Sequence, residues 1–162
     1  MTAQPLLDVS DLTVEFTTRR GIVKAVQHVN ISVGKGETVG IVGESGSGKS
    51  VTSYAVMRIL DRAGRIAEGS VMFSGIDVKA ATESQMRDLR GREVSMIFQN
   101  PRAALNPIRK VGHQIEDVLR QHVQQAQVTD RGETAIEALE QVKIARPRER
   151  YHAYPFELSG GM

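Results

Sequence analysis

The chain contains no cysteine and no tryptophan among its 162 residues. The lack of cysteine excludes disulfide bonds, thiolate zinc sites and a thiol nucleophile. The histidines have no paired metal spacing along the sequence, so each is expected to be a surface residue; they are His28, His113, His122 and His152.

Long hydrophobic runs and blocks of like charge are also missing. No apolar stretch approaches the ~20 residues that a membrane-spanning helix needs, and residues 1–11 lack the basic and apolar regions of a signal peptide. The formal net charge of +2 is not gathered in a basic block, so binding to nucleic acid is not indicated. The sequence therefore predicts a soluble cytosolic protein, nominally one domain.

A glycine-rich stretch is the strongest signal that the chain does contain. It has the spacing G-x-x-x-x-G-K-S, the pattern of a phosphate-binding P-loop. An apolar segment at 38–42 precedes it and predicts a buried strand, whereas apolar residues at helical spacing follow it over 50–60. The loop residues are Gly43, Glu44, Ser45, Gly46, Ser47, Gly48, Lys49 and Ser50.

Each part of this stretch suits the chemistry of nucleotide phosphates. The glycines can adopt positive φ angles and bring main-chain N–H groups close to an anion at the start of a helix. Lys49 is expected to reach the β- and γ-phosphates, and the Ser50 hydroxyl to ligate Mg²⁺. Val51 can offer only its backbone N–H to an α-phosphate. The pattern predicts binding of ATP with Mg²⁺.

Hydrophobic periodicity predicts the remaining elements. Strands are expected over 6–17, with a bend near Ser10 and Asp11, and over 22–33, followed by a hairpin over 69–78 and an apolar strand over 93–98. Helices are expected over 83–90, 111–125 and 133–143, the last with Asp130 and Glu133 at capping-box spacing. An antiparallel sheet thus leads into a parallel α/β core.

Three further segments, taken together with the P-loop, carry a resemblance to a known family. Gln99 comes directly after the apolar strand expected over 93–98, within Ile97-Phe98-Gln99-Asn100-Pro101. Leu105-Asn106-Pro107 follows it, and Tyr154-Pro155 precedes Leu158-Ser159-Gly160-Gly161-Met162. In this order the segments resemble the ATP-binding subunits of ABC transporters, in particular importers of dipeptides and oligopeptides. The resemblance extends from Leu6 to Met162 but covers only the first half of such a subunit.

The resemblance implies an α/β fold: a P-loop NTPase core with an N-terminal antiparallel β subdomain and a helical subdomain. It places the β subdomain and core at about 1–98, and the segment led by Gln99 with the helical subdomain at about 99–162. The sheet is expected to be incomplete because the C-terminal half is absent. A gap is expected beside Val39–Val42, where the missing strands belong.

The resemblance also assigns roles to residues outside the P-loop. Phe16 is expected to stack on the adenine ring, and Gln99 to meet Mg²⁺ and the attacking water, making it a catalytic residue together with Lys49. Gln99 would also lead the segment that contacts the transmembrane subunit. The signature loop, Ser159, Gly160 and Gly161, would close over the γ-phosphate bound at a partner's P-loop.

Partners and location follow from the same resemblance. It implies a second ATP-binding subunit in a head-to-tail dimer, transmembrane permease subunits and, indirectly, a solute-binding protein. The protein would then lie peripherally at the cytoplasmic face of the inner membrane.

Hydrolysis of ATP requires a metal-holding Asp and a group that activates water. In the family both follow the signature loop as an Asp-Glu pair, and no such pair ends an apolar strand among these residues. ATP binding without turnover is therefore expected, whether the chain was cut or is a truncated gene product.

Three alternatives stay open from the residues alone. The transported solute could be nickel or another small molecule, since solute choice resides in other subunits. The chain could be a non-catalytic remnant. A soluble GTPase or nucleotide kinase is less favoured: Asp61-Arg62-Ala63-Gly64 fits D-x-x-G, but it follows a helix, and no N-K-x-D motif occurs.

Overall fold

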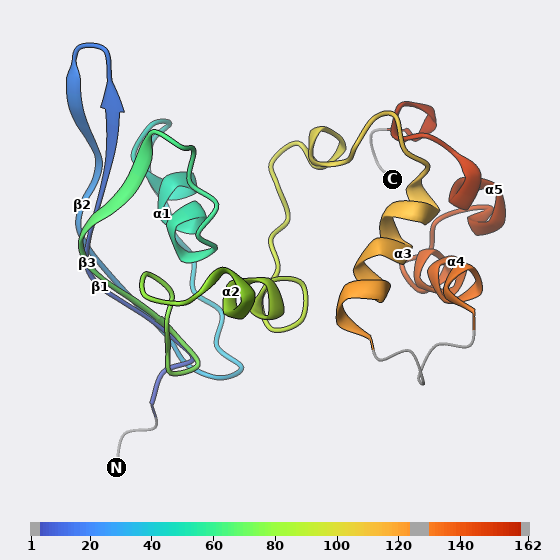
Figure 1. Cartoon of the computed structure of the whole chain (residues 1–162), viewed down its shortest axis with the longest axis horizontal. Coiled ribbons are helices and arrows are strands. Elements are labelled where there is room, and N and C mark those ends of the chain that lie inside the picture. The colour runs from blue at the N-terminus through green and yellow to red at the C-terminus, as the bar shows by residue number, and fades with distance from the viewer. Residues whose placement is uncertain (1–3, 124–129, 160–162) are drawn as a thin grey trace. The chain divides into compact units, whose positions relative to one another are not determined.

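The computed structural model describes residues 4–123 and 130–159. The chain divides into two compact units, Met1–Arg90 and Gly91–Met162. We call them the strand unit and the helical unit (Figure 1).

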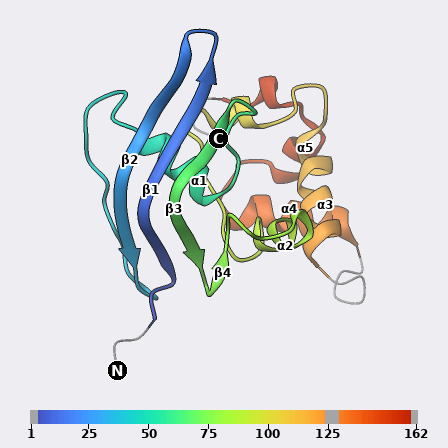
Figure 2. The ribbon, with the colours of Figure 1, turned by 60° about the vertical axis from the view of Figure 1, so that its left-hand side comes forward.

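The strand unit is built on one antiparallel sheet in the order β2-β1-β3-β4 (Figure 2). The predicted strands over 6–17 and 22–33 are confirmed, and the predicted hairpin forms with a longer first strand. The strands are β1 (Leu7–Thr18), β2 (Gly21–Val33), β3 (Gly64–Phe73) and β4 (Ile76–Asp77).

The three long strands bend at the same level of the sheet. Asp11 in β1 has φ 51 and His28 in β2 has φ 52, and the pairing register of β1 with β2 shifts between Val9 and Leu12. In β3, Gly69 has φ 78, and a Cβ there would lie 2.3 Å from the Asp11 carbonyl oxygen, so only glycine fits. The predicted bend near Ser10 and Asp11 is confirmed.

Two helices complete the strand unit, α1 (Lys49–Val56) and α2 (Glu83–Leu89). The α1 helix contacts β1, β2 and β3. It ends sooner than the sequence pattern predicts, because Arg58 takes a left-handed conformation with φ 51. The unit's core consists of hydrophobic side chains from the sheet, together with Ala55, Met57, Val78, Met86 and Leu89. The buried hydrophobic residues of the sheet are Val9, Leu12, Val14, Val26, Val71 and Phe73.

Two predicted strands do not form. Residues 38–42 and 95–98 have no regular secondary structure, and Val94 makes only an isolated bridge. Val42 is 94% exposed and Ile97 is 92% exposed. A strand of a parallel sheet needs neighbouring strands to receive its backbone hydrogen bonds, and no described strand pairs with either segment. The predicted gap beside Val39–Val42 is confirmed.

Within residues 91–123 and 130–159, the helical unit forms three α-helices and two short 3-10 helices. The predicted helices α3 (Val111–His122) and α4 (Arg131–Gln141) are confirmed. The α3 helix ends before the predicted residue Gln125, which lies outside the described residues, and α4 begins and ends two residues earlier than predicted. The sequence pattern did not predict α5 (Pro147–His152) or the 3-10 helices η1 (Pro101–Ala104) and η3 (Pro155–Glu157).

A separate hydrophobic core holds the three α-helices together. Val111, Ala135, Leu139 and Tyr151 are buried in it, and Ile115, Leu119 and Ile136 pack against it. Val118 and Val142 lie outside this core and are exposed. Asp130 caps α4 as predicted by accepting from the N–H groups of Gly132 and Glu133, at 2.8 and 3.2 Å. The Glu133 side chain binds Arg148 instead of completing a capping box.

Candidate functional site: a phosphate-binding loop

The P-loop lies between the irregular segment 38–42 and the start of α1. Gly48 is the residue before the first turn of the helix and has φ 92, and Gly46 has φ 83. A side chain at either position would strain the backbone. Residues 43–47 are exposed, so the N–H groups at the start of α1 are open to an anion.

Two glycines of the loop are closely packed. A Cβ on Gly48 would lie 2.9 Å from the Ala25 carbonyl oxygen and 3.0 Å from the Val26 Cγ2 atom. A Cβ on Gly43 would lie 2.6 Å from the Ser47 Oγ atom. By contrast, nothing lies within 4 Å of the position of a Cβ on Gly46. The loop is therefore anchored on β2 at one end and open at its centre.

Lys49 holds its ammonium group against the loop. The Nζ atom donates hydrogen bonds to the carbonyl oxygens of Gly43 and Glu44, both at 2.6 Å, and to Ser47 Oγ at 3.3 Å. Ser50 follows in the first turn of α1, with an exposed side chain. A cation, open amide groups and a hydroxyl are thus gathered at one helix end, a donor set that fits a nucleotide phosphate with Mg²⁺.

Phe16 lies on the same face of the sheet as the P-loop. It pairs with Val23 on β2 and with Gly64 on β3. A Cβ on Gly64 would lie 2.7 Å from the Phe16 ring, so the ring covers this glycine and leaves part of its own surface open. Val14, two residues earlier and so on the same face, pairs with Val26, which touches the loop at Gly48. The register therefore brings an aromatic ring to the P-loop side of the sheet.

The other predicted site residues belong to the helical unit. Gln99 follows the irregular segment 95–98 and is exposed, and Ser159 is exposed after η3. Gly160 and Gly161 lie outside the described residues. The structure thus groups Phe16 with the P-loop in one unit and places Gln99 and Ser159 in the other.

Two arginines that the sequence did not single out hold the C-terminal end of α1. Arg90 donates from Nε to the Met57 carbonyl oxygen at 2.8 Å and from Nη2 to that of Arg58 at 2.7 Å. Arg58 in turn donates to the Val78 carbonyl oxygen at 3.2 Å and pairs with Glu83. Cations at a helix C-terminus complement its partial negative charge. They fix the helix that carries Lys49, but no local sequence pattern marks such long-range contacts.

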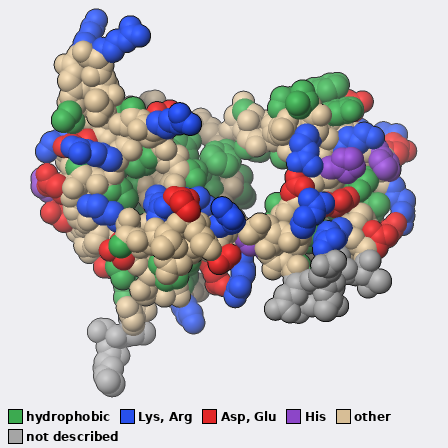
Figure 3. Space-filling model, viewed as in Figure 1, with side chains coloured by type: hydrophobic (Ala, Val, Ile, Leu, Met, Phe, Trp, Pro, Cys, Tyr) green, Lys and Arg blue, Asp and Glu red, His purple; other side chains and the backbone are tan. Residues whose placement is uncertain are grey.

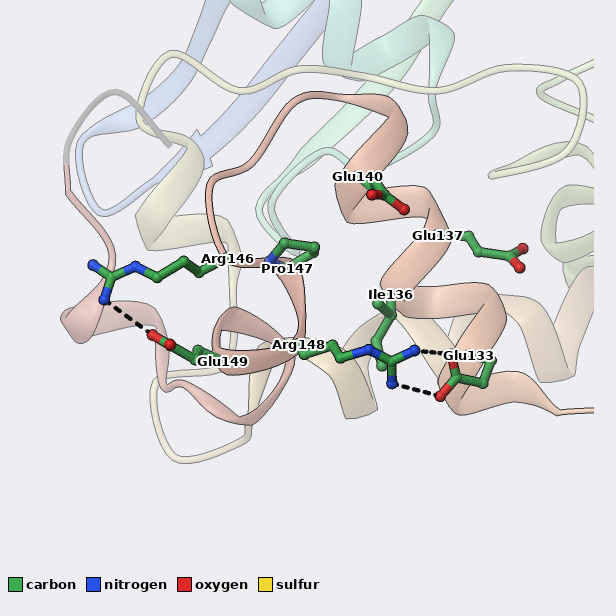
Figure 4. A pocket seen from close by; sticks show the side chains of 8 residues that line it. All are labelled: Glu133, Ile136, Glu137, Glu140, Arg146, Pro147, Arg148 and Glu149. Carbon is green, nitrogen blue, oxygen red and sulfur yellow. Dashed lines mark hydrogen bonds and ion pairs between the residues drawn. The ribbon is translucent and has the colours of Figure 1, made fainter.

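A hollow of about 510 Å³ lies between α4 and α5 (Figure 4). Arg148 makes two parallel hydrogen bonds to Glu133, each 2.8 Å, and this carboxylate raises the pKa of Arg148. Arg146 pairs with Glu149 at 3.2 Å. Both arginines that line the hollow are paired with glutamates, and the contact of Arg148 with Glu133 joins α5 to α4.

A second hollow, of about 370 Å³, lies between η1 and η3. Phe156, one of its lining residues, is 67% exposed and stacks on Tyr154 with ring centroids 5.6 Å apart. Ile108, which follows η1, is 82% exposed. Figure 3 shows hydrophobic side chains gathered at the upper edge of this unit. The surface that follows Gln99 is therefore partly apolar.

Comparison with known families distinguishes an ABC ATPase from a soluble GTPase or nucleotide kinase. Residues 26–162 match a protein family described as "ABC transporter". The chain belongs to the ABC transporter family. No helix among residues 4–123 and 130–159 is long and apolar enough to cross a membrane.

Named relatives of this family member are peptide-transport proteins. The chain is 45% identical to the oligopeptide transport ATP-binding protein OppD of Bacillus subtilis, over 97% of the chain and 44% of the relative. It is 45% identical to the dipeptide transport ATP-binding protein DppD of Escherichia coli, over 97% of the chain and 48% of the relative. The chain spans about half the length of the curated relatives it matches.

Solved structures confirm the fold class. The post-hydrolysis dimer of the ATP-binding cassette MJ0796 bound to ADP and Pi matches with a TM-score of 0.77 at 24% identity, over 96% of this chain and 64% of that one. A second dimeric MJ0796 structure matches with a TM-score of 0.79. The strand unit and the helical unit are therefore parts of an ABC ATPase fold whose sheet is not closed in the described residues.

Proposed function

We propose that the chain is the nucleotide-binding part of an ATP-binding subunit that powers the import of dipeptides or oligopeptides. The main observation that supports this proposal is the P-loop, with Lys49 and Ser50 at the start of α1 and Gly48 packed against β2. The names of the peptide-transport relatives support the class of solute.

Binding of the nucleotide requires a change of partners at Lys49. The ammonium group exchanges the carbonyl oxygens of Gly43 and Glu44 for phosphate oxygens, a charge-assisted contact. Ser50 supplies a hydroxyl ligand for Mg²⁺, and Phe16 offers the open part of its ring to the base. A Mg²⁺ ion held by Ser50 would supply positive charge that stabilises the phosphates.

The helical unit supplies the proposed contacts with partners. Gln99 reaches Mg²⁺ and the attacking water, and Ser159, Gly160 and Gly161 close over the γ-phosphate held by a second ATP-binding subunit. The partly apolar surface around Phe156 receives a transmembrane permease subunit, which holds the protein at the cytoplasmic face of the membrane. The functional boundary between the two parts lies near residue 98.

A substitution at Lys49 tests the nucleotide site. Replacing Lys49 with Ala removes a charge-assisted contact, so the affinity for Mg-ATP should fall roughly ten- to a hundredfold. Lys79→Ala, at an exposed lysine of the same unit, should leave the affinity unchanged. The measurement is isothermal titration calorimetry of the three proteins.

Two results would count against the proposal. Equal affinity for Mg-ATP in the unchanged chain and in Lys49→Ala would remove the P-loop from the binding site. Displacement of bound ATP by GTP at equal or lower concentration would favour a guanine-nucleotide protein.

A further inference from the structure

We propose that Asp11, His28 and Glu68 form a binding site for a divalent transition-metal ion on the strand unit. The three side chains are exposed and come from β1, β2 and β3. They bring together one imidazole and two carboxylates, the ligand types that Zn²⁺ accepts. Among the described residues, no other group of three such side chains converges in this way.

The site lies on the face of the sheet opposite the P-loop. Glu68 contacts Lys24, which pairs with Glu15. Because Glu15 is the neighbour of Val14 along β1, the two side chains point to opposite faces. Figure 3 shows histidine and acidic side chains together on the outer flank of the strand unit. The proposed metal is thus distinct from the Mg²⁺ of the nucleotide.

The ligand atoms are already close to one another. His28 Nδ1 lies 2.8 Å from Asp11 Oδ1, and all three ligand atoms lie within 4.8 Å of one another. Ligands bound at about 2.0–2.2 Å to a tetrahedral Zn²⁺ lie about 3.4 Å apart. Small rotations of the exposed side chains are enough to close the site around an ion.

The backbone conformation fixes the positions of Asp11 and His28 relative to each other. Asp11 and His28 both have positive φ angles at the shared bend of the sheet. The Asn30 side chain links them, since its Oδ1 accepts from the Asp11 N–H at 2.9 Å and its Nδ2 donates to the His28 carbonyl oxygen at 3.3 Å. The two ligands are therefore held side by side by a neighbouring residue that is not itself a ligand.

Lys24 does not block the site. Its Nζ atom lies 3.8 Å from Glu68 and also 3.8 Å from Glu15. When Glu68 turns toward a metal, Lys24 keeps Glu15 as its partner. Two carboxylates then face the ion together with an unprotonated imidazole, the form that binds metals.

The test is a calorimetric titration of the untagged 162-residue chain with Zn²⁺, in the cold and without nucleotide. We expect saturable binding of one ion, weakened at least tenfold in His28→Asn, Asp11→Asn and Glu68→Gln. Asparagine tolerates the positive φ angles at 11 and 28, so the bend is retained. The control is His152→Asn, at an exposed histidine of the helical unit, which should bind Zn²⁺ as the unchanged chain does.

Circular dichroism of each metal-free variant separates loss of a ligand from loss of the fold. Unchanged Zn²⁺ affinity in the three site variants would overturn the proposal. An equal loss of affinity in His152→Asn would overturn it too, because the ion would then bind elsewhere. Equal affinity for Mg²⁺ and Zn²⁺ would also contradict the proposal. Because Mg²⁺ prefers oxygen ligands, that result would mean that the carboxylates alone attract the ion and that His28 is not a ligand.

Discussion

At the scale of single residues, Tyr151 links the core of the helical unit to its surface. Its hydroxyl donates a hydrogen bond to Glu116, and this bond, together with burial, raises the pKa of Tyr151 to about 12. Because the pKa in the folded state lies above the ordinary value of 10.0, the neutral phenol is favoured in the folded chain. Its contribution to stability is complete below pH 10 and is lost as the pH rises toward 12.

An ultraviolet titration tests this residue directly. The chain has three tyrosines. We expect one ionisation step near pH 12, and this step should be absent in Tyr151→Phe. Tyr154→Phe is the control and should leave that step in place. Ionisation of all tyrosines near pH 10 in the unchanged chain would contradict the proposed role of Glu116.

At the scale of elements, the packing of α3 against α5 depends on a glycine. Gly112 is buried in the first turn of α3, and a Cβ there would lie 2.1 Å from the Tyr151 ring. Gly112→Ala should therefore destabilise the helical unit by about 1–3 kcal/mol through overpacking. The measurement is urea unfolding followed by circular dichroism, in which the midpoint should fall.

Gly132→Ala in α4 is the matched control for this substitution. A Cβ on Gly132 would lie 3.2 Å from Asp130 Oδ1 and 3.4 Å from the Tyr151 hydroxyl, distances that small side-chain shifts relieve. Alanine also favours a helix over glycine by roughly 0.5–1 kcal/mol. A higher urea midpoint for Gly112→Ala than for Gly132→Ala would show that the Tyr151 ring moves aside easily.

The elements that the sequence predicted well are those with local patterns. The β1–β2 hairpin has alternating apolar residues around a tight turn, and α3 and α4 have helical periodicity. The α5 helix is only six residues long, and it follows Arg146 with φ 55, so no periodic signal marks it. Residues 38–42 and 93–98 carry the apolar runs of strands, but a strand also needs neighbours, and sequence pattern alone does not show whether they are present.

The candidate site likewise has features that a local sequence pattern predicts and features that depend on long-range contacts. The G-x-x-x-x-G-K-S spacing identified the loop because phosphate chemistry fixes residue types at short range. The contacts of Gly48 with Ala25, of Phe16 with Gly64, and of Arg90 with the end of α1 join residues distant in sequence. Such contacts follow from strand register and helix packing, which only the structure reveals.

At the scale of the whole molecule, the proposed nucleotide site lies in a sequence of 162 residues in which no Asp-Glu pair ends an apolar strand. The metal-holding Asp and the water-activating group supply much of the stabilisation of the transition state. We therefore expect the chain by itself to bind Mg-ATP with turnover far below ~1 s⁻¹, an ordinary rate for an enzyme. Phosphate release at saturating Mg-ATP measures it, with Lys49→Ala as the control for contaminating activity. Turnover at ~1 s⁻¹ or more that Lys49→Ala abolishes would show that residues within this chain complete the site.

The exposed apolar segments also bear on the stability of the whole chain. Val42 is 94% exposed and Ile97 is 92% exposed, in two segments whose sequence pattern suits the interior of a parallel sheet. Their backbone groups pair with no described strand, which makes them templates for association with other chains. Since folded domains are stable by only ~5–15 kcal/mol, the loss of central strand pairing should consume most of that margin.

We therefore expect the isolated chain to unfold below ~45 °C, the lower end for ordinary domains, or to aggregate on heating. Thermal unfolding followed by circular dichroism, with and without Mg-ATP, measures this, and light scattering detects aggregation. Replacing Val42 and Ile97 with Thr tests the cause, because a hydroxyl at each exposed position should reduce aggregation without moving the unfolding midpoint. A sharp, reversible transition above ~45 °C in the unchanged chain would mean that residues 1–162 close their own core. In that case the segments 38–42 and 93–98 would find partners within this chain, and the open edge would not limit its stability.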